Sequence, residues 1–188
     1  MWRGRGAGVS NGMAHTDTDP AIVLTTLRAS DEGDVRSWLQ RFLRHHNSTW
    51  ADALALGWSA GEVDAQQVAI DLVERHWQAL WRAAHDERQI VVAARLDGRL
   101  LGCVWACCER HAYLGIRVGV LSWIYVAPWG RRHGVGKALI DAVREWMRMR
   151  RIVSLQVSVL ANNQAAIRLY RSAGLEIADV RMMGAVDP

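Results

Sequence analysis

The 188-residue chain contains little lysine, phenylalanine and proline, and it has no long apolar run. Lys137 is the single lysine beside 22 arginines, and Phe42 is the single phenylalanine beside 10 tryptophans. No stretch of 18 apolar residues occurs, which argues against a membrane-spanning helix. The first residues also lack the apolar segment of a secretory signal. We therefore expect a cytoplasmic protein that does not act in a membrane.

Cysteine is scarce as well. Cys103, Cys107 and Cys108 are an odd number of cysteines on one predicted strand, which makes a poor disulfide framework. They also lack the paired spacing and the distant histidine partners of a zinc site. We expect buried, reduced thiols and no metal.

The remaining composition is that of an ordinary globular protein, with 51% hydrophobic and 22% charged residues. The length suits about one domain. Residues 1–20 are rich in Gly, Thr, Asp and Asn without periodicity. We therefore predict a disordered N-terminal tail at 1–20 and a single domain over residues 21–188.

The formal net charge of +4 and the isoelectric point near 9.4 first suggest a polyanionic partner such as nucleic acid. Residues 128–151 carry seven basic and two acidic side chains, a net charge of +5, so the rest of the chain carries −1. The basic residues at the end of this segment show no recognition-helix pattern and no aromatic-interleaved strand. These are Arg144, Arg148, Arg150 and Arg151. Since cations suit the C-terminus of a helix, we favour a small polyanion over nucleic acid.

In the first half of the chain, hydrophobic periodicity predicts strands and helices. Asp97-Gly98 is a strong two-residue hairpin signal between two apolar segments. Ser59-x-x-Glu62 has the form of a helix capping box, and apolar residues as far as Ala84 share one helical face behind it. The predicted elements are a strand at 22–27, a helix at 31–46, one long helix behind the capping box, and strands at 90–96, 100–109 and 118–126.

In the second half, apolar residues from Val135 to Met147 form an unbroken stripe at helical spacing. We predict a strand at 152–159, a helix at 163–173 that ends at Gly174, and one or two strands within 175–186. Strand, helix and strand in succession form a βαβ unit, so its two strands are expected to lie parallel with a right-handed crossover. The pattern as a whole predicts an α/β domain.

The junction between the strand and the helix of this unit contains the residues that indicate a binding site. It reads Pro128-Trp129-Gly130-Arg131-Arg132-His133-Gly134-Val135-Gly136-Lys137. Glycines allow a sharp turn, and the amides of a first helical turn lack partners inside the helix, so this loop suits phosphate oxygens. It is not a nucleotide P-loop, because Arg131 and Ala138 replace a required Gly and Ser/Thr. It is not a dinucleotide fingerprint either, because Leu139 replaces the third glycine. The alternative is a glycine-rich turn without a ligand.

Two spaced motifs identify a family resemblance. Arg131, Gly134 and Gly136 match Gln/Arg-x-x-Gly-x-Gly/Ala, and Asn163, Ala166, Tyr170, Gly174 and Leu175 match Asn-x-x-Ala-x-x-x-Tyr-x-x-x-Gly-Phe/Leu. Over 123–175 the chain thus resembles the GNAT superfamily of acyl-CoA-dependent N-acetyltransferases. The resemblance implies an α+β type of α/β fold, with a mixed, mostly antiparallel central sheet, a splayed parallel strand pair and about four flanking helices. It also implies direct transfer of an acetyl group from acetyl-CoA to a primary amine of a small-molecule or peptide acceptor.

The resemblance implies roles for individual residues. The amides from Arg132 to Lys137 would hold the pyrophosphate of coenzyme A, and the strand edge at Ile124 and Val126 would pair with the pantetheine arm. Tyr170 would protonate the departing thiolate as the catalytic residue; the alternative is a core aromatic. The implied cofactor-binding set is Ile124, Val126, Arg131, Arg132, His133, Gly134, Val135, Gly136, Lys137 and Asn163. For Asn163 the alternative, or additional, role is a plain helix N-cap.

The chain departs from a frequent family pattern at Ser122 and Trp123, where many members carry a carboxylate. Glu109, His111 or a water chain remain as candidates for the general base, while a strand-edge charge and a loop histidine are the simpler interpretations of these two residues. The base therefore stays unassigned.

The acceptor side is expected to consist of residues 47–61 and 109–118. Trp50 and Trp58 would line it or pack as core or lid residues, and the acidic residues nearby are too scattered to define a pocket for polyamines. The acceptor stays open. The alternative function is a non-catalytic acyl-CoA-binding module of the same fold. Homodimers are common in the family, although no pattern in this chain indicates one.

Overall fold

The computed structural model describes residues 21–184, so the tail predicted at 1–20 lies outside the described residues. The helices are α1 (Glu32–Ala53), α2 (Ala60–Ala69), α3 (Leu72–Ala83), α4 (Val135–Met149) and α5 (Gln164–Ser172). The strands are β1 (Val23–Thr25), β2 (Gln89–Leu96), β3 (Arg99–Arg110), β4 (Arg117–Val126) and β5 (Leu155–Gln156). Two short 3₁₀ turns, η1 (Ala29–Asp31) and η2 (Pro128–Gly130), precede α1 and α4. Across residues 21–184, every helix is too short or too polar to cross a membrane.

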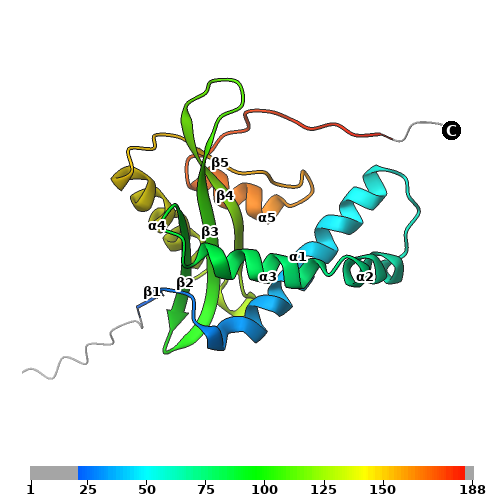
Figure 1. The fold of residues 1–188 in the computed structure, drawn as a ribbon, viewed down its shortest axis with the longest axis horizontal. Coiled ribbons are helices and arrows are strands. Elements are labelled where there is room, and N and C mark those ends of the chain that lie inside the picture. The colour runs from blue at the N-terminus through cyan, green and yellow to red at the C-terminus, as the bar shows by residue number, and fades with distance from the viewer. Residues whose placement is uncertain (1–20, 185–188) are drawn as a thin grey trace, which may run out of the picture.

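The five strands form one mixed sheet in the order β1-β2-β3-β4-β5 (Figure 1). β1 to β4 pair antiparallel, and β4 and β5 pair parallel. The β2–β3 hairpin turns through Asp97 and Gly98, which both take positive φ as a type I′ turn requires. The predicted sheet, the hairpin and the βαβ unit are confirmed.

The parallel pair is short and then opens. β5 pairs with β4 only through Gly119↔Leu155 and Val120↔Gln156. From residue 121 to 126 the edge of β4 on that side has no strand partner among the described residues. The predicted splay of the two strands is therefore present, and it leaves a free strand edge that ends just before η2.

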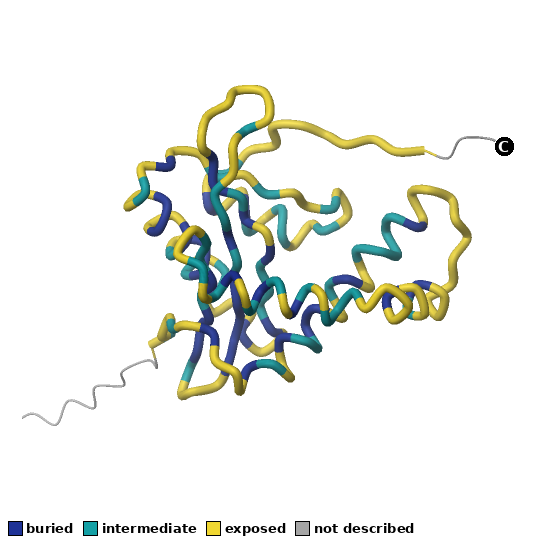
Figure 2. The backbone as a smooth tube through the Cα atoms, viewed as in Figure 1, coloured by how far each residue is buried: buried dark blue, intermediate teal, exposed yellow. Residues whose placement is uncertain are grey.

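Helices cover both faces of the sheet, because successive side chains of a strand point to opposite sides. Cys103 of β3 packs in the core with α1 and α3, whereas Val104 packs with α4 and α5. Figure 2 shows the buried residues concentrated along the strands and the inward faces of these helices. We call the two sides the α1–α3 face and the α4–α5 face.

Helices form where the sequence predicted them, but some of the predicted helix boundaries were wrong. The Ser59–Glu62 capping box is confirmed, since Ser59 Oγ accepts from the Glu62 N–H at 3.3 Å and Glu62 Oε2 accepts from the Ser59 N–H at 2.7 Å. The single long helix expected behind it is wrong: Asp71 takes a left-handed φ of +49° and separates α2 from α3. α1 continues past the predicted end at 46 to Ala53, because the inward face is maintained by the buried Ala51.

Two strand predictions and one cysteine prediction need correction. The strand predicted at 152–159 shrinks to β5, and Val153 is 91% exposed because no sheet face covers it. The strands predicted within 175–186 do not form in residues 175–184. Leu175 still packs on the core, and residues 176–184 run as an exposed segment away from the sheet (Figures 1 and 2). Cys103 is buried as predicted, but Cys107 and Cys108 are only half-buried.

Candidate functional site

The turn predicted to bind phosphate lies where the free edge of β4 ends and α4 begins. Gly134 is the N-cap of α4, with a left-handed φ of +75°. Arg132 is also left-handed, with φ of +65°. This conformation costs a non-glycine residue about 1–2 kcal/mol, and such strain is concentrated at functional turns.

The turn presents a row of backbone donors without acceptors. The first bond into α4 runs from the Ala138 N–H to the Gly134 carbonyl at 2.9 Å. Within the part of the chain that the structure describes, no acceptor engages the N–H groups of residues 132–137. Free amides at the positive end of a helix dipole attract anions. Because the Val135 side chain is buried, only its amide is available for such a contact.

The basic side chains of the turn reach outward. Arg131 Nε donates to the Val126 carbonyl at 3.3 Å, which ties the turn to the end of β4. Lys137 Nζ forms an exposed ion pair with Asp141 at 2.6 Å. Surface pairs of this kind contribute at most about 1 kcal/mol, so Lys137 can exchange its partner for an anion. Arg132 and His133 are exposed, and residues 128–137 follow one another through η2, the loop after it and the first turn of α4.

Gly136 and Gly134 meet different structural requirements. A Cβ atom on Gly136 would lie 3.0 Å from Leu169 Cδ2 of α5, whereas a Cβ on Gly134 would meet nothing within 4 Å. Gly136 therefore lets α5 approach the start of α4, and Gly134 supplies the backbone angle of the turn. The close approach brings the second motif next to the first.

The free edge of β4 begins at a β-bulge that the sequence did not reveal. Trp105 pairs with Trp123 and Ala106 pairs with Leu121, so Ser122 is the extra residue. The insertion shifts the alternation of side chains: Leu121 packs on the α4–α5 face and Trp123 on the α1–α3 face. Beyond the bulge, Ile124 and Val126 are half-buried against the α4–α5 face.

α5 carries the remaining predicted site residues. Asn163 Oδ1 accepts from the Ala166 N–H at 3.2 Å, so the N-cap interpretation of Asn163 is confirmed. Tyr170 is 8% exposed and belongs to the core cluster on which Ile124 and Val126 pack. Burial raises the pKa of the Tyr170 hydroxyl to about 12 and keeps it protonated at neutral pH.

The two candidates for the base have local structural partners. His111 Nδ1 accepts from the N–H groups of Tyr113 and Leu114, both at 3.3 Å, which stabilises the β3–β4 loop. Glu109 pairs with Val118 near the start of β4, before its free edge begins. The structure brings neither residue to the turn. Among residues 21–184, no group of three or more His, Cys, Asp or Glu side chains is placed to hold a metal ion.

Sequence reasoning missed a cavity of about 110 Å³ beside the β4 bulge. We call it the bulge cavity. Its polar members are Ser122 and His76, and Trp123 forms part of the wall. The predicted acceptor wall at Trp50 and Trp58 lies elsewhere, outside this lining. The only signal for His76 in the sequence was its position within the helix predicted behind the capping box, beside the apolar face.

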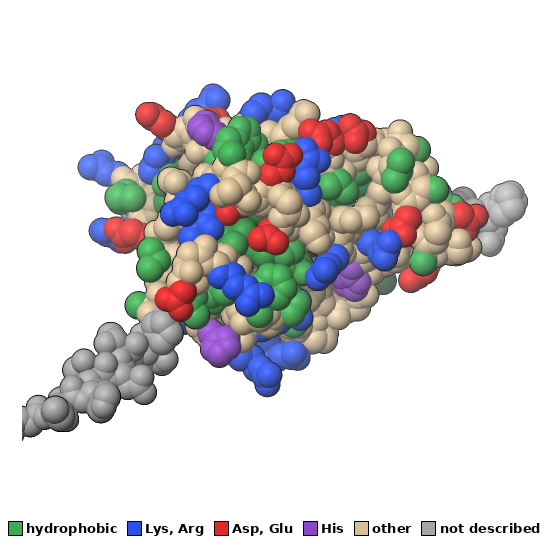
Figure 3. Space-filling model, turned by 90° about the horizontal axis from the view of Figure 1, so that it is seen from below, with side chains coloured by type: hydrophobic (Ala, Val, Ile, Leu, Met, Phe, Trp, Pro, Cys, Tyr) green, Lys and Arg blue, Asp and Glu red, His purple; other side chains and the backbone are tan. Residues whose placement is uncertain are grey.

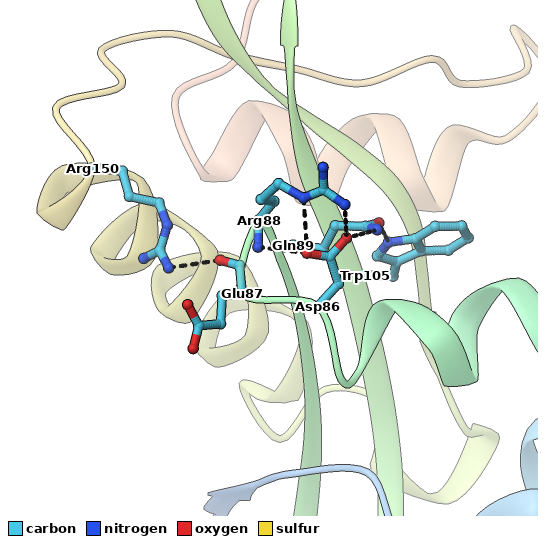
Figure 4. A network of polar contacts seen from close by, with 6 residues as sticks. All are labelled: Asp86, Glu87, Arg88, Gln89, Trp105 and Arg150. Carbon is cyan, nitrogen blue, oxygen red and sulfur yellow. Dashed lines mark hydrogen bonds and ion pairs between the residues drawn. The ribbon is translucent and has the colours of Figure 1, made fainter.

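Three of the four arginines considered for nucleic-acid binding contact partners within the chain. Arg144 donates to the Ala173 carbonyl, and Arg148 pairs with Glu145. Arg150 donates to the Glu87 carbonyl at 2.8 Å, which ties the end of α4 to the α3–β2 turn (Figure 4). On the face drawn in Figure 3, basic and acidic side chains are interspersed.

Comparisons with known proteins agree with this geometry. The profile of the Acetyltransferase (GNAT) family matches residues 50–175, which include the turn and α5. The chain is 33% identical over 96 residues to the aminoglycoside N(6')-acetyltransferase type 1 of Klebsiella aerogenes, covering 49% of this chain and 62% of that protein. It is 35% identical over 83 residues to the peptidyl-lysine N-acetyltransferase YiaC of Escherichia coli, covering 44% and 47%.

These matches span only about half to three fifths of the length of the curated relatives. Similarity of fold extends further. The structure of the aminoglycoside N-acetyltransferase AAC(6')-Iy in complex with CoA has a TM-score of 0.58 at 18% identity, covering 89% of this chain and 95% of that one.

Proposed function

Because the chain belongs to the acetyltransferase (GNAT) family, we propose that it transfers an acetyl group from acetyl-CoA directly to a primary amine. The observation that carries the proposal is the row of free amides at residues 132–137, which follows a free strand edge. The amides suit a pyrophosphate, and the strand edge suits the two amide groups of the pantetheine arm. The CoA complex of the similarly folded AAC(6')-Iy supports the same ligand.

The proposed cofactor site follows from this placement. Phosphates would lie at the amides from Arg132 to Lys137, with the side chains of Arg131, Arg132, His133 and Lys137 around them. The pantetheine arm would pair with the backbone at Ile124 and Val126. Asn163, already the N-cap of α5, would face the cofactor through its amide group.

The transfer forms one bond and breaks one. The neutral amine attacks the thioester carbonyl carbon, the new C–N bond forms, the C–S bond breaks, and coenzyme A leaves as a thiolate. Tyr170 gives its proton to the thiolate, and the proton lost by the acetylated nitrogen restores the tyrosine hydroxyl through solvent. Backbone amides of the free β4 edge would polarise the carbonyl, and most of the rate would come from holding the reactants together.

The test is release of free thiol from acetyl-CoA in the presence of primary amines, with the acetylated product identified by mass spectrometry. We expect amine-dependent thiol release. Tight binding of acetyl-CoA without thiol release, over a panel of aminoglycosides, lysine peptides and simple amines, would instead favour the non-catalytic acyl-CoA-binding module.

A further inference from the structure

The bulge cavity is mostly apolar. α1 contributes Leu39 and Phe42, α3 contributes Leu80, and β3 contributes Trp105. Apolar surface of this kind binds apolar groups by removing them from water. An engineered cavity of about 150 Å³ lined by Leu, Ile and Phe binds benzene. The bulge cavity, with a volume of about 110 Å³, is of the size of one small ring or a branched alkyl group.

The cavity lies beside the proposed path of the cofactor. With its phosphates at residues 132–137, the arm of the cofactor runs back along the free edge of β4 from Val126 toward the bulge. Ser122 and Trp123 belong to this same stretch of β4, and both line the cavity. A molecule in the cavity therefore lies across β4 from the α4–α5 face and close to the acyl end of the arm.

Two of the residues that line the cavity have a polar atom without a hydrogen-bond partner among the described residues. Trp123 is 5% exposed and its indole N–H has no partner among the described residues, whereas the Trp105 indole N–H donates to Gln89 Oε1 at 2.8 Å (Figure 4). A buried donor without a partner costs about 1–3 kcal/mol. His76 Nδ1 contacts the Leu72 carbonyl at 2.8 Å, which places the proton of a neutral ring on Nδ1 and leaves the lone pair on Nε2.

No carboxylate lines the cavity. Three carboxylates of the neighbouring elements are paired with arginines: Glu74 with Arg36, Asp64 with Arg44, and Asp31 with Arg95. Glu109 of β3 lies outside the lining and contacts Cys107 Sγ. A second ammonium group inside the cavity would have no carboxylate in the lining to pair with, and an unpaired buried charge is costly. The cavity therefore disfavours polycationic acceptors.

We propose that the bulge cavity holds the apolar group of a primary monoamine acceptor, an arylalkylamine in chemical class, and that His76 takes the proton of its ammonium group. This inference rests on the proposed acetyl transfer. His76 Nε2 accepts the proton from R–NH₃⁺ and passes it to solvent, and the resulting R–NH₂ attacks the thioester.

The first experiment measures kcat/KM for phenethylamine, spermidine, the aminoglycoside neamine and a lysine peptide. We expect phenethylamine to exceed each of the others by about tenfold or more, a difference of about 1.4 kcal/mol in the transition state. Ser122→Phe fills the mouth of the cavity from an exposed position and should raise KM for phenethylamine by a larger factor than it raises the Kd of acetyl-CoA. Ser30→Phe, also exposed but outside the cavity lining, is the matched control.

The second experiment tests separately whether His76 removes the proton from the ammonium group of the acceptor. O-benzylhydroxylamine has nearly the shape of phenethylamine but is already neutral at neutral pH, so it needs no base. We expect His76→Gln to lower kcat/KM for phenethylamine by about 100-fold and that for O-benzylhydroxylamine far less. An equal loss for both amines would overturn the role of His76.

The outcomes also separate this inference from the proposed function. Preference for spermidine, neamine or the lysine peptide would overturn the monoamine proposal while leaving acetyl transfer intact. Binding of acetyl-CoA with no thiol release from any amine would overturn both.

Discussion

Gly134 and Gly136 stand two residues apart and serve different physical needs. Gly134 provides a left-handed N-cap, and Gly136 provides room for Leu169 of α5. Their motif was visible in the sequence because both needs restrict the residue to glycine or a small side chain. The bulge at Ser122 was not visible, because one extra residue in a strand ladder changes no composition or periodicity strongly enough.

Tyr170 is the residue whose proposed chemistry can be isolated most simply. Tyr170→Phe keeps the buried ring and removes the proton donor, so kcat should fall by about 100-fold while the Kd of acetyl-CoA changes little. Tyr113, which is 94% exposed in the β3–β4 loop, gives the control variant Tyr113→Phe. Steady-state kinetics and calorimetry measure the two quantities. Unchanged kcat in Tyr170→Phe would assign Tyr170 to packing alone.

At the scale of elements, the strongly amphipathic segments were predictable and their interruptions were not. α4 and α5 follow the apolar stripe and the N-cap seen in the sequence. The break between α2 and α3 depends on one left-handed residue, Asp71, inside a stripe that reads as continuous. β5 is shorter than its alternating pattern because a strand needs a partner, and pairing with β4 stops after Gln156.

A buried ion pair connects the first elements to the sheet. Arg95 of β2 donates to Asp31 of η1 at 2.5 Å, and both side chains are about 95% buried. Asp31→Asn leaves the Arg95 charge buried and unpaired, so the free energy of unfolding should fall by about 3–5 kcal/mol. Urea unfolding measures the change. Asp34→Asn, in the exposed first turn of α1, should change it by less than about 0.5 kcal/mol; equal effects of the two variants would contradict the account.

At the scale of the whole molecule, the proposed cofactor site and the proposed acceptor cavity lie on opposite sides of β4. The free amides and the free strand edge adjoin the α4–α5 face, and the bulge cavity lies on the α1–α3 face. The sequence predicted the first side, since its glycines, basic residues and second motif are close along the chain. It did not predict the second side, because that cavity combines α1, α3, β3 and β4, which only tertiary packing brings together.

The buried Tyr170 hydroxyl and Cys103 thiol should make the stability of the folded protein depend on alkaline pH. Burial raises the pKa of Tyr170 from 10 to about 12 and that of Cys103 from 9 to about 12. The folded state holds these protons more tightly than the unfolded state does. The two groups therefore destabilise the folded state little below pH 9, and the free energy of unfolding falls as the pH rises from 9 toward 12. A shift of two units corresponds to roughly 3 kcal/mol.

Urea unfolding at a series of alkaline pH values measures this loss. The Tyr170→Phe and Cys103→Ala variants should each show a weaker dependence on pH than the unmodified chain. A free energy of unfolding that stays constant from neutral pH into this alkaline range would show that neither proton is held by burial.

Calorimetric titration of acetyl-CoA measures whether the turn at residues 132–137 binds the phosphates of the cofactor. Gly134→Glu places bulk and negative charge in the turn. Gly115→Glu is the matched control, because Gly115 has a similar φ of +64° and open space around it in the β3–β4 loop, at the opposite end of β4 from the turn. We predict that Gly134→Glu weakens binding by about tenfold or more, or about 1.4 kcal/mol, while Gly115→Glu binds as the unmodified chain does. Equal affinity in the two folded variants would contradict the account.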